Sequence, residues 1–91
     1  MRVTVEYFGP ARDAAGVGGD SIDCEAGLTA QSLVEQIARN RGGRLASLLL
    51  TDGKLSRSVL LAVNDHEVAD AKPLAEGDAI AIIPPVSGGA R

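Results

Sequence analysis

The chain has 91 residues, of which 45% are hydrophobic and 23% are charged, and its net charge at pH 7 is −3. This length and composition predict one small globular domain and exclude an intrinsically disordered protein. The acidic balance, the scattered basic residues and the near absence of aromatic side chains argue against nucleic acid as a partner.

The first predicted element is a strand over residues 1–8, in which apolar and polar residues alternate. Its inward face consists of Val3, Val5 and Tyr7. Gly9 and Pro10 break the strand, and the glycine-rich stretch at 16–20 predicts a turn. A second strand at 21–25, with Ile22 and Cys24 on its inward face, would complete a hairpin.

A helix follows and carries the strongest pattern in the chain. Its apolar residues recur at helical spacing and form one stripe, made of Ala30, Leu33, Val34, Ile37 and Ala38. Thr29 suits the N-cap, and Gly42 suits the left-handed closing position. A short helical turn is predicted next, with Leu45, Leu48 and Leu49 tucked under the sheet, and Asp52-Gly53 then turns the chain.

The last third of the chain predicts further strands. Residues 58–63 are apolar on both faces, which is typical of a central strand that is covered on both sides or lies next to the helix. Asn64-Asp65 predicts a turn before a short strand at 66–69. After a turn at 76–78, a final strand at 79–83 runs directly into two prolines, which cannot continue a ladder.

Together these elements predict an α+β fold with a mixed sheet of four or five strands and one main helix on one face. No internal repeat or low-complexity linker is present. We therefore predict a single domain over residues 1–83 and a tail over residues 84–91.

The tail has the sequence PPVSGGAR. Its prolines, Pro84 and Pro85, favour an extended direction, and the chain then thins through Val86, Ser87, Gly88 and Gly89, so a narrow channel could admit it. If Gly89 were the last residue, its carboxylate could attack the α-phosphate of ATP, and a sulfur nucleophile could then replace AMP. On composition alone the favoured interpretation is a frayed end without chemistry.

Four stretches of the sequence instead favour a reactive tail. They are VTVEYFGPARDAAG, LTAQSLVEQIARN, LLAVNDHEVA and PLAEGDAIAIIPPVSGG. Through them the chain resembles the MoaD/ThiS group of ubiquitin-like β-grasp sulfur carriers over nearly its whole length. YFGPAR and PPVSGG are the most specific segments and favour the molybdopterin synthase branch.

The resemblance implies that an E1-like enzyme adenylates Gly89 with Mg-ATP and that a sulfurtransferase system then makes a thiocarboxylate. The tail would enter the large synthase subunit and donate sulfur to a cyclic pterin precursor. The chain would be a carrier without a cofactor of its own. By the same resemblance, Phe8, Arg12 and Ile83 are candidate docking residues. General burial tendencies instead place Phe8 and Ile83 in the core and Arg12 in solvent.

The chain departs from the family pattern at Ala90-Arg91, because the diglycine is terminal in the family. Either a protease removes the dipeptide, or the reactive role is lost, or the dipeptide is an addition to the natural chain. Other functions also stay open: a carrier for thiamine, cysteine or tRNA thiolation, a ubiquitin-like modifier joined to lysines, or a non-reactive interaction module.

Other candidate sites are weaker. Cys24 lies on a strand face without a neighbouring His or Cys, so we predict a buried small side chain. His66 follows a turn without a second ligand at metal spacing, and no metal site is expected. The single cysteine and the lack of a signal-peptide pattern predict the cytoplasm, and the longest apolar run, 59–63, is too short to span a membrane.

Overall fold

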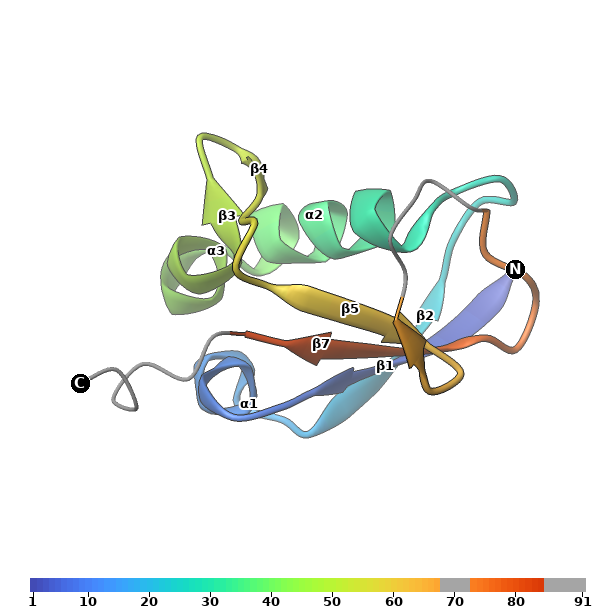
Figure 1. Ribbon diagram of the computed structural model, residues 1–91, viewed down its shortest axis with the longest axis horizontal. Coiled ribbons are helices and arrows are strands. Elements are labelled where there is room, and N and C mark those ends of the chain that lie inside the picture. The colour runs from blue at the N-terminus through green and yellow to red at the C-terminus, as the bar shows by residue number, and fades with distance from the viewer. Residues whose placement is uncertain (68–72, 85–91) are drawn as a thin grey trace.

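The computed structural model describes residues 1–67 and 73–84. A five-stranded sheet lies at its centre, and helix α2 (Ala30–Arg41) crosses one face of this sheet (Figure 1). The strand order is β2-β1-β7-β5-β6. The strands are β1 (Arg2–Tyr7), β2 (Gly19–Asp23), β5 (Leu60–Val63), β6 (His66–Glu67) and β7 (Ala79–Ile83). This arrangement confirms the predicted α+β class, with one main helix on a mixed sheet.

The first and last strands pair side by side at the centre of the sheet. β1 and β7 are parallel, with Tyr7 opposite Ile82, whereas all other neighbouring pairs in this sheet are antiparallel. Both strands alternate as predicted, and their buried residues are Val3, Val5, Tyr7, Ile80 and Ile82. The end of β7 is therefore held between β1 and β5, which fixes where the chain leaves the sheet.

Helix α2 begins and ends where its sequence predicts. The Thr29 hydroxyl accepts a hydrogen bond from the backbone N–H of Ser32 at 3.1 Å, which satisfies one donor of the first turn. Gly42 ends the helix with a positive φ of 62° but a ψ of −158°, so it departs from the left-handed helical conformation that we predicted. The expected apolar stripe is buried in full.

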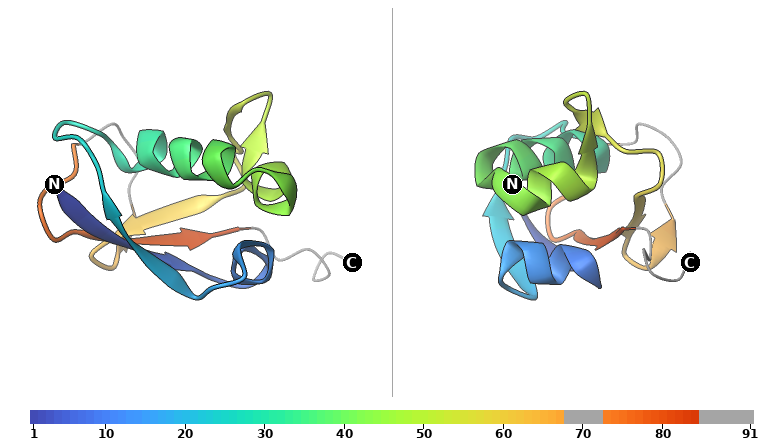
Figure 2. Two further views of the ribbon diagram at one scale, coloured as in Figure 1. Left: turned by 180° about the vertical axis from the view of Figure 1, so that it is seen from behind. Right: turned by 90° about the vertical axis from the view of Figure 1, so that its left-hand side faces the viewer.

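Three short elements lie beyond the C-terminal end of α2 (Figure 2). Helix α3 (Gly43–Leu49) confirms the predicted helical turn; Leu45 and Leu49 are buried as expected, whereas Leu48 is only half-buried. The Asp52-Gly53 turn joins two strands too short to be predicted, β3 (Leu50–Thr51) and β4 (Lys54–Leu55). The Glu35 carboxylate on α2 accepts a hydrogen bond from the Leu55 N–H at 2.8 Å and anchors this hairpin.

Strand β5 lies against α2 on one face only, so one of the two alternatives predicted for it is confirmed and the other is wrong. Its sequence is apolar on both faces, and we expected cover on both sides or a place next to the helix. Only the side of Leu61 is buried, whereas Leu60 points away from α2 and is 48% exposed. The apolar character of the outer face is thus not explained by burial within this domain.

The remaining predictions concern the edges of the sheet. β2 forms the expected hairpin with β1, and Cys24, just beyond it, is half-buried and packs against the core. His66 is exposed on β6, after the Asn64-Asp65 turn. Residues 68 and 69 of the predicted strand lie outside the described residues. No helix in the part of the chain that the structure describes is long and apolar enough to cross a membrane.

A polar cluster fastens the end of α2 to the sheet. Arg41 forms an ion pair with Asp20 on β2 and donates to the carbonyl of Ala15 at 3.3 Å. Its guanidinium also lies 5.7 Å from the centre of the Tyr7 ring, and the Tyr7 hydroxyl donates to Asp20 at 3.3 Å. Burial raises the pKa of Tyr7 above 10.0, and the positive charge of Arg41 partly opposes this shift.

The raised pKa predicts how stability depends on alkaline pH. Because the folded state holds the Tyr7 proton more tightly than the unfolded state, the stabilising contribution is present below pH 10 and is lost as pH rises through the folded pKa. Tyr7 is the only tyrosine and there is no tryptophan, so phenolate absorbance reports this group alone. A midpoint at or below 10 would contradict the burial of Tyr7, and Tyr7→Phe should remove this part of the pH dependence.

Candidate functional site

The candidate site lies where β7 ends, at the root of the tail. The last described residue, Pro84, is buried. The other residues assigned to the tail lie outside the described residues; they are Pro85, Val86, Ser87, Gly88, Gly89, Ala90 and Arg91. The boundary between the domain and the tail at residue 84 stays a prediction. The structure therefore describes the surface from which the tail starts.

Three large apolar side chains lie together on the outer face of the sheet at this end. Phe8 is 43% exposed, Ile83 is 39% exposed and Leu60 is 48% exposed. Leu60 is the cross-strand neighbour of Ile83, and the Phe8 backbone N–H donates to the Ile82 carbonyl at 3.1 Å. We call Phe8, Leu60 and Ile83 the apolar patch.

The pleat of the sheet explains why the patch faces outward. Tyr7 and Ile82 point into the core, so the next residue of each chain segment, Phe8 or Ile83, points to the opposite face. The expectation from general burial tendencies, that Phe8 and Ile83 belong to the core, is therefore wrong. Both side chains are exposed, as their expected role in docking a partner requires.

Leu60 belongs to the patch but was not predicted. A strand that is apolar on both faces indicates burial on both sides, and only the pairing of β5 with β7 shows that Leu60 joins Ile83 in the open. Two residues further along these strands, Ala62 lies opposite Ala81, and these two small side chains continue the apolar outer face. An apolar residue at an outward position of β5 was the sequence signal that could have identified Leu60. The register of β5 against β7 was needed to interpret that signal.

Arg12 is on helix α1 (Pro10–Ala15), which follows the patch residue Phe8 and which the sequence indicated only as a break. Gly9 has φ 52° and ψ −130°, a conformation costly for residues with a Cβ, and it turns the chain from β1 into α1. The Arg12 side chain is exposed and lies against Gly18, where a Cβ would approach its Nε within 3.5 Å. The solvent-exposed reading of Arg12 is thus correct and compatible with docking.

The described residues offer a surface for binding, and the candidate reactive group lies in the tail. No cluster of three or more His, Cys, Asp or Glu side chains suited to a metal ion occurs within residues 1–67 and 73–84. Fully burying a Phe, Leu or Ile side chain contributes about 1.5–3 kcal/mol. Because much of each patch residue is still exposed, a partner that covered the patch would gain a share of that stabilisation from each one.

Comparison with known proteins gives a family match over residues 5–89, to the model described as the ThiS family. The molybdopterin synthase sulfur carrier subunit of Chlamydomonas reinhardtii is 32% identical over an alignment of 91 positions. The alignment covers 98% of this chain and all of that protein. The subunit with the same name from Escherichia coli is 36% identical over 87 residues, covering 96% of this chain and 99% of that protein.

Solved structures agree with the sequence relatives. SAMP1 from Haloferax volcanii superposes with a TM-score of 0.83 at 22% identity, covering 98% of this chain and all of that chain, which shows a shared fold. A protein–protein complex of subunits 1 and 2 of the molybdopterin-converting factor from Helicobacter pylori contains a chain with a TM-score of 0.63 at 27% identity. That match covers 98% of this chain and all of the matched chain. The predicted β-grasp fold is confirmed.

Proposed function

We propose a function from the premise that this chain belongs to the ThiS family. The chain is a small sulfur carrier of this family, and it is a carrier subunit of an enzyme complex rather than an enzyme by itself. We propose that its sulfur goes to molybdopterin and that its acceptor is a large synthase subunit. The two curated relatives support this branch because both are molybdopterin synthase subunits.

The reactive atom in this proposal is a carboxylate oxygen of Gly89. Hydrolysis of the Gly89–Ala90 peptide bond by a protease frees that carboxylate and releases the dipeptide Ala90-Arg91. The observation that carries the assignment is the end of the family match at residue 89, the second glycine. The match leaves out the two residues that would block the chemistry.

The chemistry then proceeds in two steps on partner enzymes. The Gly89 carboxylate attacks the α-phosphorus of Mg-ATP, so that a carbon-bound oxygen gains a P–O bond and pyrophosphate leaves. A sulfur nucleophile at the oxidation level of hydrosulfide, supplied by a sulfurtransferase, attacks the acyl carbon and expels AMP. The resulting thiocarboxylate is a stronger nucleophile than the carboxylate and can react away from water inside the acceptor.

The apolar patch supplies the docking surface in this proposal. It lies at the end of β7 from which the tail starts, so a partner that covers the patch also receives the tail. The solved complex of subunits 1 and 2 of the molybdopterin-converting factor from Helicobacter pylori supports a partner of this kind. We propose the same surface for the activating enzyme and the large subunit, which would bind in turn.

An activation assay tests this function. The chain ending at Gly89 should support exchange of labelled pyrophosphate into ATP by the E1-like enzyme of the same organism, because adenylation is reversible. The chain ending at Arg91 is the matched control and should give none, since its Gly89 carbonyl is an amide. Absence of exchange with the chain ending at Gly89 would contradict the proposed function.

A further inference from the structure

Charges are unevenly distributed along the long axis of the molecule. The elements at the end where β7 finishes, namely α1, the last turn of α2, α3 and the β4 hairpin, carry most of the described basic residues (Figures 1 and 2). We call this the basic end and define it by Arg12, Arg39, Arg44, Lys54 and Arg57. The opposite end carries Asp23, Glu25, Asp65, Glu76 and Asp78. The net charge of −3 conceals this polarity.

The basic end also carries two acidic residues, Asp13 on α1 and Asp52 in the turn before β4, so basic residues are in excess there. Arg12, Arg44, Lys54 and Arg57 are all exposed, and none forms an ion pair or hydrogen bond with another described residue. Arg39 donates to the Gly53 carbonyl at 3.2 Å, which leaves its charge unbalanced. Arg41 is ion-paired with Asp20 and is therefore left out of the definition.

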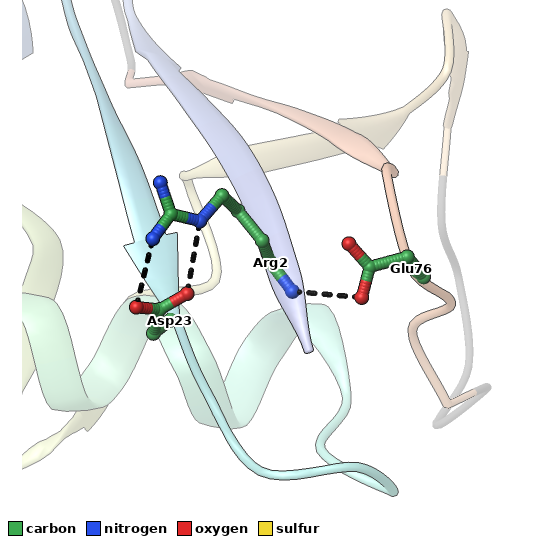
Figure 3. Close-up of polar contacts among 3 residues, drawn as sticks. All are labelled: Arg2, Asp23 and Glu76. Atoms are coloured by element: carbon green, nitrogen blue, oxygen red, sulfur yellow. Dashed lines mark hydrogen bonds and ion pairs between the residues drawn. The ribbon is translucent and has the colours of Figure 1, made fainter.

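The opposite end is organised differently. Arg2 forms a two-bond ion pair with Asp23, with both distances at 3.0 Å, and its backbone N–H donates to Glu76 at 3.1 Å (Figure 3). The one described basic side chain at this end is thus already neutralised. Although Asp23 is paired with Arg2, the residues Glu25, Asp65 and Glu76 still leave the far end with an excess of negative charge over the N-terminal ammonium, whereas cations are in excess at the basic end.

A groove of about 600 Å³ lies within the basic end. It runs between α1 and α3, and its lining consists of Pro10, Ala14, Gly43, Arg44, Ser47 and Leu48. The lining is mostly apolar and has one cation, Arg44, without a described partner. Such a groove fits a segment in which an apolar side chain is close to a carboxylate.

We propose that the basic end docks onto an acidic surface of the ATP-dependent activating enzyme, and that an acidic, partly apolar segment of that enzyme occupies the groove between α1 and α3. This inference rests on the proposed function. Complementary charge raises the rate of encounter, and the acidic far end disfavours approach in the reverse orientation. The domain therefore meets the enzyme with the root of its tail in front.

Neutral variants of the chain ending at Gly89 test this docking surface in the pyrophosphate exchange assay. Arg44→Gln should raise the KM for the carrier about threefold, and Arg44→Gln with Arg57→Gln about tenfold, while kcat stays unchanged. The differences should shrink at high salt, because salt screens exposed charges. Arg2→Gln removes the same charge at the far end and should leave the KM for the carrier unchanged.

A second variant separates the groove from the charge. Ser47→Phe keeps every charge and fills part of the groove, so it should also raise the KM for the carrier, with an unchanged dependence on salt. Ser47 is exposed on α3, and near-ultraviolet or far-ultraviolet circular dichroism would verify that this variant is folded. A KM equal to that of the parent chain would contradict occupation of the groove.

The outcomes distinguish this inference from the proposed function. Normal exchange with unchanged KM in the Arg44 and Arg57 variants would overturn the docking surface and leave the sulfur carrier function intact. A rise in the KM for ATP, with an unchanged KM for the carrier, would show that these cations meet nucleotide phosphates and would likewise overturn it. Absence of exchange with the parent chain ending at Gly89 would overturn both.

Discussion

Gly88→Val, made in the chain ending at Gly89, is expected to reduce thiocarboxylate formation to background. The tail must pass through a channel to bring the Gly89 carboxylate to ATP, and a branched side chain next to it widens the chain at its narrowest point. Valine also restricts the backbone, whereas glycine adopts almost any conformation. Mass spectrometry of the intact product, after incubation with activating enzyme, Mg-ATP and a sulfur source, measures the yield.

The control for this variant is its stability. Residue 88 follows the last core strand by several positions, so thermal unfolding should match that of the parent chain. Gly88→Ala should retain partial activity because a single methyl group adds less width, and Ser87→Ala should leave activity near normal. Normal thiocarboxylate yield from a folded Gly88→Val chain would refute the requirement for a narrow tail.

Leu60→Glu is expected to weaken binding to the large synthase subunit of the same organism by about 100-fold, or about 2.7 kcal/mol. The substitution places a carboxylate on a surface that a partner would desolvate, directly opposite Ile83 on the neighbouring strand. Because Leu60 is 48% exposed, the cost to folding should be small. Isothermal titration calorimetry measures the dissociation constant.

Val17→Glu is the matched control for the patch. Val17 is a large apolar residue with 41% exposure, and it lies in the turn before β2, outside the apolar patch. The same change of charge should therefore have little effect on the affinity for the large subunit. Equal losses in the two variants would indicate a general effect of negative charge, and an unchanged affinity in Leu60→Glu would rule out the patch as the docking surface.

The well-predicted part of the fold is the part with a repeated pattern. Strands β1 and β7 alternate over five or six residues, and the apolar stripe of α2 runs over nine residues, from Ala30 to Ala38, so each pattern is long enough to exclude the alternatives. Helix α1 was missed because Gly9-Pro10 indicates a break, although proline also suits a first helical turn. β3 and β4 have two residues each, too few for a periodic signal.

The candidate site could also be predicted only in part, because some of its residues come together through contacts between distant parts of the chain. Phe8, Arg12 and Ile83 came from a resemblance to known sulfur carriers, and no pattern in the sequence placed them together. Leu60 was missed because its exposure depends on the register of β5 against β7, which joins residues 60 and 83. The excess of basic residues at the basic end could not be predicted from the sequence either, because it depends on how α1, α3 and the β4 hairpin are arranged in space.

The central claim is that Gly89 becomes the free, sulfur-bearing end of this chain. The most direct test is the intact mass of the protein isolated from its own cells, with fragmentation of its C-terminal peptide. We predict a chain that ends at Gly89, with a fraction in which sulfur replaces one carboxylate oxygen. A chain that ends uniformly at Arg91 in cells that are making molybdopterin would contradict the claim and would favour a non-reactive interaction module.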